Sequence, residues 1–289
     1  MIDSKLVKYQ TLPVWTKDTL PRSFQEKHNT KQGTLAKLTI LEGALEYCAL
    51  DENGNVQSTH IYSTENPPPL IEPQSWHRVK PLSDNLRCFL EFYCLVEHYY
   101  QKKYHLSLPH SEVLEVLQYI QSGDALDLGC GRGRNSILLQ TRGFSVTALD
   151  KSEASMGKLS EIIDAEEDCR GIQPKVYDIQ TASIQNHYDL IISTVVFQFL
   201  QSASISSVIQ NMQEHTRPGG YNLIVAPVST DNRPCPIKFP FTFGENELKN
   251  YYRLWTICKY NENLGVFHRM DEDGNPYQSK FATLIAQNK

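Results

Sequence analysis

The sequence predicts a doubly wound α/β domain over residues 124–289, preceded by a small all-β domain over residues 1–94. Short extended runs separated by turn residues fill the first part of the chain. Beyond residue 124, continuous apolar runs alternate with helical segments, as parallel strands buried on both faces should. A glycine-rich turn joins the first of these runs to a helix, which is where open α/β sheets place their ligands.

The composition favours a globular protein that acts on small molecules. Of the 289 residues, 40% are hydrophobic and 21% are charged, which is enough apolar surface for two modest cores. The net charge of -5 leaves no basic surface for a nucleic acid partner. The seven cysteines are odd in number and form no C-x-x-C pair, so neither a disulfide framework nor a metal site is expected. We expect a cytoplasmic protein without a membrane partner, and a homo-oligomer stays open.

The first domain is predicted from five extended runs, "LAKLTILEG", "ALEYCALDENGNVQ", "STHIYST", "PPPLIEPQSWHRVKPL" and "RCFLEFYC". The Asn-Gly pair in "DENGNV" is typical of a tight hairpin turn. The prolines in "PPPLIEP" place that segment at an edge or rim, because proline cannot donate to a sheet. Such a unit resembles the cupin-like domains. Its histidines, His28, His60 and His77, include no H-x-H pair, so we assign no metal and no chemistry to it.

Residues 95–123 are predicted to form a linker and a helix that precedes the second sheet. Pro109 marks a break before this helix, and apolar residues follow at helical spacing. Ser111 is the expected N-cap, with Glu115 behind it.

The second domain follows a strand-helix alternation. Strands are expected at residues 125–129, 145–150, 175–179, 188–194 and 221–228, and helices at 134–142, 153–164, 203–215 and 245–253. "RPGGYNLIV" indicates a helix stop and a turn before the fifth strand. "LWTICKY" and "SKFATLIAQ" then form a hairpin around "DEDGN", so the last of seven strands runs antiparallel to the others.

The stretch "DLGCGRGRN" carries the main functional signal. A dinucleotide fingerprint requires G-x-G-x-x-G, but here the third glycine comes one residue early, so the pattern is D-x-G-x-G-x-G. Gly129, Gly131 and Gly133 allow a ligand to approach the backbone at the start of a helix. Asp150 ends the second strand, where its carboxylate can accept hydrogens from two ribose hydroxyls.

This pattern resembles motif I of the class I S-adenosylmethionine-dependent methyltransferases. The resemblance implies S-adenosyl-L-methionine as cofactor and S-adenosyl-L-homocysteine as product. It also implies that Asp127 organises the methionine end, that Asp178 accepts from the adenine amino group and that the Ile179 N–H meets a ring nitrogen. The implied cofactor-binding residues are Asp127, Gly129, Gly131, Arg134, Asn135, Asp150, Lys151, Asp178, Ile179 and Thr194.

Longer strings narrow the resemblance. "STVVFQFL", "FPFTFGENELKNYY" and "KYNENLGVFHRMDEDGNPYQSKFATLIAQ" are similar to the TehB family of tellurite-resistance methyltransferases, in the form with a cupin-like N-terminal domain. The implied activity is methylation of tellurite and of selenium oxyanions. Such an anion needs cationic donors to hold it, and His268 and Arg269 lie at the end of the sixth strand, on the predicted cofactor side. We therefore expect these two residues to be catalytic.

Several alternatives stay open at this point. His268 and Arg269 are equally compatible with a solvated hairpin, in which case the loop around Arg233 and Cys235, or His110 as part of a lid, could cover the site. The substrate could be a small thiol or an organic acid. The protein could also be a sensor that binds S-adenosylmethionine without turnover.

Overall fold

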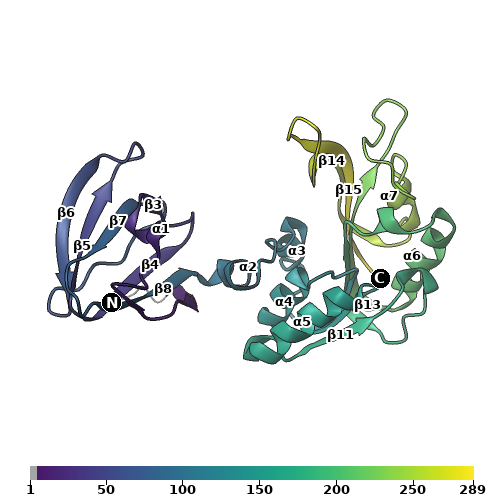
Figure 1. Ribbon diagram of the computed structural model, residues 1–289. Helices are drawn as coiled ribbons and strands as arrows, with labels where there is room; N and C mark the ends of the chain where they lie inside the picture. The colour runs from purple at the N-terminus through teal and green to yellow at the C-terminus, as the bar shows by residue number, and fades with distance from the viewer. Residues whose placement is uncertain (1–4) are drawn as a thin grey trace. The chain divides into compact units, whose positions relative to one another are not determined.

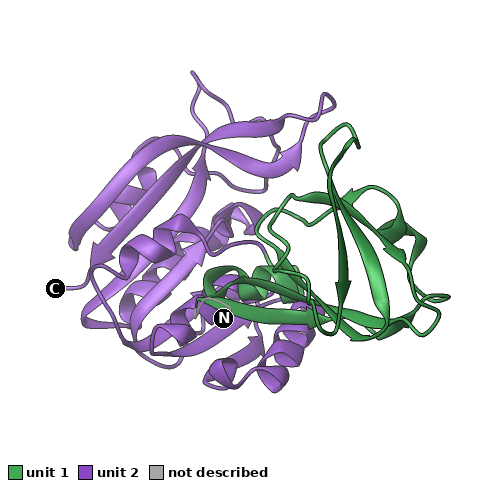
Figure 2. Cartoon of the chain, turned by 90° about the vertical axis from the view of Figure 1, so that its left-hand side faces the viewer, with its two compact units in different colours: residues 1–106 green, residues 107–289 purple. Residues whose placement is uncertain are grey.

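The computed structural model describes residues 5–289 and divides the chain into two compact units (Figure 2). The first unit ends at Leu106, and the second spans Ser107–Lys289. The predicted linker of residues 95–123 is divided between them, because α2 (Tyr99–Tyr104) belongs to the first unit and α3 (Ser111–Val116) to the second.

The first unit consists of two antiparallel sheets. In one, β1, β4 and β2 all pair with β8, and the other has the order β3-β7-β5-β6. Alternating side chains of both sheets, such as Leu38, Leu90 and Leu45, form a common core. The bounds are β1 (Leu6–Thr11), β2 (Trp15–Thr16), α1 (Arg22–Gln25), β3 (His28–Asn29), β4 (Leu35–Glu42), β5 (Ala44–Leu50), β6 (Val56–Ser63), β7 (Trp76–Pro81), β8 (Arg87–Leu95) and the short helix η1 (Val96–His98).

The hairpin between β5 and β6 turns at the predicted Asn-Gly pair. Gly54 has φ +89°, and the carboxylate of Asp51 accepts the backbone N–H groups of Asn53 and Asn55 at 2.9 and 2.8 Å. The turn is therefore closed by a side chain as well as by the glycine conformation.

The second unit has a seven-stranded sheet in the order β11-β10-β9-β12-β13-β15-β14. Its strands are parallel except for β15, which runs antiparallel between β13 and β14 and confirms the predicted terminal hairpin. In Figure 1, α4 and α5 cover one face of the sheet and α6 and α7 the other. The bounds are β9 (Gly123–Leu128), α4 (Arg134–Thr141), β10 (Phe144–Asp150), α5 (Glu153–Ala165), β11 (Ile172–Val176), β12 (Tyr188–Thr194), α6 (Ile205–Glu214), β13 (Thr216–Val228), α7 (Glu247–Tyr251), β14 (Thr256–Met270) and β15 (Pro276–Gln287).

Two predicted boundaries in this unit are wrong. The third strand ends at Val176, so Asp178 lies in the turn that follows and not on the strand. The Pro218–Gly220 segment is part of β13 and not a turn before it. Gly219 adopts φ +80° and donates its N–H to Asn288 O at 2.9 Å, so the bulged strand start is paired with the end of the chain.

The N-cap of α3 is His110 and not the predicted Ser111. The His110 Nδ1 atom accepts the Glu112 N–H at 3.2 Å, which satisfies one of the free amides at the helix start. Lys259 of β14 then holds the helix against the sheet, because its ammonium contacts the carboxylates of Glu112 at 2.7 Å and Glu115 at 2.5 Å. Helix α3 is thus an integral part of the second unit.

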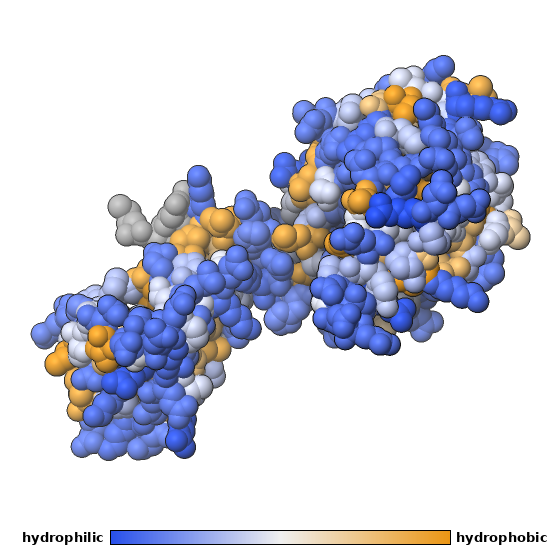
Figure 3. Space-filling model, turned by 90° about the horizontal axis from the view of Figure 1, so that it is seen from above, coloured by the Kyte–Doolittle hydropathy of each residue, from blue (hydrophilic) through white to orange (hydrophobic). Residues whose placement is uncertain are grey.

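On the face that Figure 3 shows, polar residues predominate and hydrophobic residues are interspersed among them. Within residues 5–289, every helix is too short or too polar to span a lipid bilayer. The same residues contain no cluster of three or more His, Cys, Asp or Glu side chains that could hold a metal ion.

Candidate functional site

The site lies at the carboxyl ends of the central strands, where β9 is flanked by β10 on one side and β12 on the other. The chain winds in opposite directions from this point, so the connections after these strands diverge and leave a crevice. A cavity of about 380 Å³ occupies it, lined by Gly129, Asp150, Lys151, Tyr177, Asp178, Ile179, Gln180, Thr194, Val195, Val196, Phe199 and Leu200.

Gly129, the first glycine of the turn, lines this cavity. Gly129 has φ +77°, and a Cβ atom on it would lie 2.4 Å from a methyl carbon of Val196. Val195, the neighbour of that valine, is itself held at φ +60°, which is strained for a β-branched residue. The turn is fixed to the next strand because Gly129 N and Cys130 N both donate to Leu149 O. Only glycine therefore fits at position 129.

Gly129→Ala should destabilise the protein through both backbone strain and this clash. Gly143 is the matched control, because it has φ +94° but no atom within 4 Å of the point that a Cβ atom would occupy. Gly143→Ala should cost about 1–2 kcal/mol of unfolding free energy from φ alone, and Gly129→Ala about 1–3 kcal/mol more from overpacking. Urea denaturation measures both, and equal losses would mean that Val196 yields to the new methyl group.

Asp150 connects the glycine turn to the start of α5. Its Oδ2 atom accepts the Gly131 N–H and its Oδ1 atom the Ser152 N–H, each at 2.9 Å. A carboxylate oxygen has two lone pairs, so each oxygen can still accept one hydrogen from a ligand. Asp178 is exposed and accepts the Gln180 N–H at 3.0 Å. Ile179 begins the short helix η3 (Ile179–Thr181), where an amide has no acceptor within the helix.

Asp127 lies beneath the turn and does not line the cavity. Its side chain is 1% exposed and accepts the Ser136 hydroxyl hydrogen at 2.6 Å. Burial raises the pKa of Asp127 to about 6, although the hydrogen bond from Ser136 and the nearby Arg134 oppose this shift. Cys130 in the same turn is buried as well, which raises the pKa of its thiol and makes it a poor nucleophile.

The raised pKa of Asp127 predicts a pH-dependent stability. Because the folded protein holds this proton up to about pH 6 and the unfolded chain releases it near pH 3.8, the free energy of unfolding should fall as the pH rises through that window. The expected fall is about 2–3 kcal/mol. Asp127→Asn cannot ionise and should lack this contribution. Urea denaturation of both proteins between pH 4 and 7 is the measurement, and parallel curves would contradict the assignment.

A second cluster of polar groups adjoins the turn. Asn135 accepts the His110 N–H at 2.9 Å and donates to the Thr194 hydroxyl at 3.0 Å, so it joins the start of α3 to the end of β12. Arg134 donates to Ser107 Oγ and to Leu108 O, both at 3.2 Å. Burial lowers the pKa of Arg134, and Asp127 opposes that shift.

His110 is a neutral donor within this cluster. Burial, together with the charges of Arg134 and His268, lowers its pKa to about 4. Since its Nδ1 atom accepts the Glu112 N–H, the ring hydrogen resides on Nε2. His268 is exposed at the end of β14, and its charge is one cause of the lowered pKa of His110. Arg269 is exposed next to it, and the pairing of β14 with β15 is irregular between Val266 and Met270.

The structure thus brings most of the sequence-predicted residues to one edge of the sheet. Gly129, Asp150, Lys151, Asp178, Ile179 and Thr194 line the cavity, whereas Asp127, Gly131, Arg134 and Asn135 surround the turn outside that lining. The apolar lining of Tyr177, Val195, Val196, Phe199 and Leu200 was not predicted. "VYD" and "TVVFQFL" begin with the last residues of the third and fourth strands, so their position at strand ends was the signal that could have identified them.

This arrangement fits an adenosine-containing cofactor. Carboxylates that retain free lone pairs suit ribose hydroxyls and an adenine amino group, and the apolar side chains offer a flat contact for the base. The open backbone around Gly131 leaves room for a group beside the glycine turn, since no atom lies within 4 Å of a Cβ position there. The sheet order and this crevice are those of a class I methyltransferase.

The comparisons with known proteins agree with this class. The family described as "Tellurite resistance protein TehB" matches residues 92–285, and the "TehB-like domain" matches residues 10–90. The chain is 51% identical over 286 residues to a Haemophilus influenzae protein described as "Probable S-adenosyl-L-methionine-dependent methyltransferase TehB", with 99% of each chain covered. It is also 39% identical over 244 residues to "Hemagglutinin 1" of Eikenella corrodens, covering 84% of this chain and 81% of that protein.

The crystal structure of TehB from Haemophilus influenzae superposes with a TM-score of 0.85 at 50% identity and covers all of both chains. The protein is an S-adenosylmethionine-dependent methyltransferase. The chain belongs to the TehB family, and its first unit is the TehB-like domain of that family.

Proposed function

We propose that the protein methylates tellurite, and selenium oxyanions, and that it thereby detoxifies tellurite. Two observations support this proposal. The family is described as a tellurite-resistance family. The neutral donor His110 lies beside Arg134 and near His268, at the strand ends that carry the cofactor crevice. A small anion is the substrate that such a group of donors and positive charges would attract.

The proposed cofactor contacts follow from the positions in the crevice. Asp150 would accept the ribose hydroxyls, Asp178 and the Ile179 N–H would meet the adenine edge, and the turn at Gly129 and Gly131 would carry the methionine end. Lys151 and Thr194 would contribute from the cavity wall. Asp127, Arg134 and Asn135 would support the cofactor indirectly, by holding the turn and the segment before α3 in place.

Substrate residues in this scheme hold an anion and do not remove a proton. When bound, the cofactor supplies an electrophilic methyl group on a sulfonium centre. Tellurium(IV) and selenium(IV) oxyanions carry a lone pair on the central atom, so alignment contributes more than a general base. His110 would donate through Nε2–H, and Arg134, His268 and Arg269 would neutralise the anion and orient it. Because His110 stays neutral above about pH 4, its donation would not change with pH over the physiological range.

The release of S-adenosylhomocysteine tests this function. Purified protein with S-adenosylmethionine should produce it in the presence of tellurite or selenite and only at background rate without them. A panel of small thiols and organic acids measures the main alternative substrate class. A kcat/KM for any of these compounds above that for tellurite would make the oxyanion an incidental substrate. Binding of the cofactor without turnover on any compound would favour a sensor.

A further inference from the structure

The first unit contains a cavity that has no part in the proposed methyl transfer. It has a volume of about 550 Å³, within the range of small-molecule sites. Its wall consists of side chains from β5 and β6, the start of β7 and the connection that precedes β7. Tyr47 and Tyr62 also pack against the core between the two sheets, so the cavity adjoins that core.

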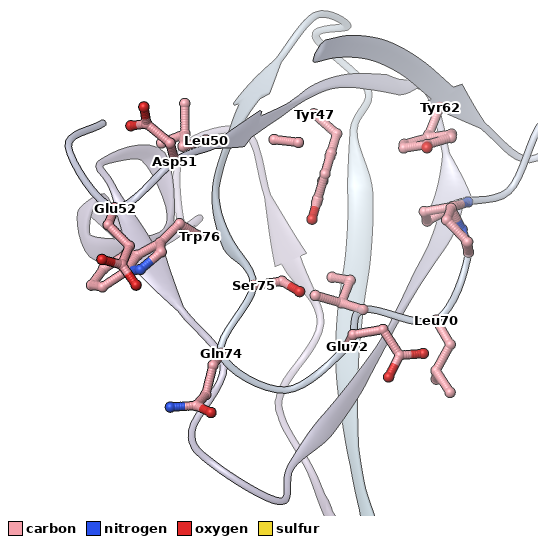
Figure 4. A pocket seen from close by; sticks show the side chains of 14 residues that line it. Tyr47, Leu50, Asp51, Glu52, Tyr62, Leu70, Glu72, Gln74, Ser75 and Trp76 are labelled. Atoms are coloured by element: carbon pink, nitrogen blue, oxygen red, sulfur yellow. The ribbon is translucent and has the colours of Figure 1, made fainter. Parts of the chain in front are cut away.

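Three aromatic rings belong to the cavity wall. Figure 4 shows the Tyr47 ring in the middle, with Trp76 to one side and Tyr62 to the other. The Tyr47 and Tyr62 rings lie 5.9 Å apart, and Tyr47 also stacks on His77 at 5.1 Å. Burial raises the pKa of Tyr47 to about 12, so its hydroxyl is neutral. That hydroxyl has no hydrogen-bond partner among residues 5–289, and in Figure 4 it points toward Ser75 across the cavity.

The charges on the wall all have one sign among the residues that the structure describes. Asp51, Glu52 and Glu72 line the cavity, and none of the described lysines or arginines does. Asp51 already accepts three hydrogens within its turn. The carboxylates of Glu52 and Glu72 have neither a hydrogen bond nor an ion pair within the part of the chain that the structure describes, so both can face a ligand. The wall therefore repels anions and attracts cations.

A lysine next to the cavity indicates that positive charge is stable at this wall. The ammonium of Lys27 lies 4.3 Å from the centre of the Trp76 ring and donates to the Glu52 carbonyl oxygen. Lys27 does not line the cavity itself. Its contact is a cation–π interaction that the protein makes with one of the cavity's own rings.

We propose that this cavity binds a small organic cation, an alkylated ammonium compound. Tyr47, Tyr62 and Trp76 would contact the charged head through their ring faces, and Glu52 and Glu72 would neutralise it. Pro68 and Leu70 would contact the alkyl groups. The oxyanion proposed as substrate carries the opposite charge and would not bind here. This inference is independent of the proposed function of the second unit.

The three tryptophans provide a direct test. In the full-length protein with ¹⁵N-labelled tryptophan, each indole N–H gives one NMR signal, and Trp76→Phe assigns the one at the cavity. Titration with choline or tetramethylammonium should move the Trp76 signal saturably and leave that of Trp255, in the second unit, in place. The neutral carbon isostere of choline, 3,3-dimethylbutan-1-ol, should bind at least about fivefold more weakly, and tellurite should have no effect.

Two variants locate the site. Glu72→Gln and Tyr47→Leu should each weaken choline binding at least about fivefold. Glu46→Gln is the matched control. It also removes one negative charge, but Glu46 lies on β5 and does not line the cavity. Glu72 is exposed, so its substitution leaves the test valid even if Tyr47→Leu does not fold. The proposal is wrong if neither cation moves the Trp76 signal up to about 50 mM, if the isostere binds equally well, or if Glu46→Gln weakens binding as much as Glu72→Gln.

Discussion

Replacing Asp150 by alanine should reduce the affinity for S-adenosylhomocysteine at least about tenfold. Two charge-assisted hydrogen bonds to the ribose would be lost, each worth about 1.5–3 kcal/mol in the absence of compensation. The substitution also removes the acceptor of the Gly131 and Ser152 N–H groups, so the glycine turn would keep only its backbone bonds to Leu149 of β10. Isothermal titration calorimetry of the folded variant measures the loss.

The matched control for this experiment is Asp164→Ala. Asp164 is exposed on α5, so its replacement changes the net charge equally without touching the crevice. Asp150→Asn separates the support of the glycine turn from the contacts to the ribose. Its amide oxygen can still accept the Gly131 N–H, but the side chain cannot accept two further hydrogens from the ribose. If Asp150→Ala binds S-adenosylhomocysteine as tightly as Asp164→Ala does, the ribose is held elsewhere.

Replacing His268 or Arg269 by alanine should lower kcat with tellurite by about 10²-fold while the affinity for S-adenosylhomocysteine hardly changes. Losing one preorganised donor has an effect of this size when the donor acts on the transition state. The charges of His268 and Arg134 both act on His110, so loss of His268 would leave the proposed anion cluster incomplete. Single-turnover kinetics with saturating cofactor separate this effect from binding.

Arg253→Ala is the control for the arginine variant, because Arg253 is exposed after α7 and lies outside the crevice. An unchanged kcat in both the His268 and the Arg269 variants would assign these residues to a solvated hairpin. Loss of activity in only one of the two variants would assign the anion contact to that residue alone.

The sequence was informative about this site because its key residues follow strands. Asp150 ends a continuous apolar run, and the spacing of Gly129, Gly131 and Gly133 distinguishes the turn from a dinucleotide fingerprint. The carboxyl ends of parallel strands meet at one edge of the sheet, so the predicted parallel strands placed these residues together. The antiparallel last strand followed in the same way from two strand-like runs with no helix between them.

Contacts between segments that are distant in the sequence could not be predicted in this way. The N-cap role of His110 depends on its Nδ1 atom reaching Glu112 N, and its place in the site depends on Asn135, 25 residues later. Strands β2 and β3 were missed because each has two residues and exists only through its pairing with β8 or β7. The cavity of the first unit depends on sheet pairing that no local pattern encodes.

The most direct test of methyl transfer to tellurium follows the methyl group itself. Purified protein is incubated with S-adenosylmethionine that carries a trideuterated methyl group and with tellurite, and the products are analysed by mass spectrometry. The proposed function predicts methylated tellurium with the complete trideuterated methyl group and one S-adenosylhomocysteine for each methyl transferred. Asp150→Ala should reduce both products in parallel at limiting cofactor. Release of S-adenosylhomocysteine without labelled methyl on tellurium would contradict the proposal.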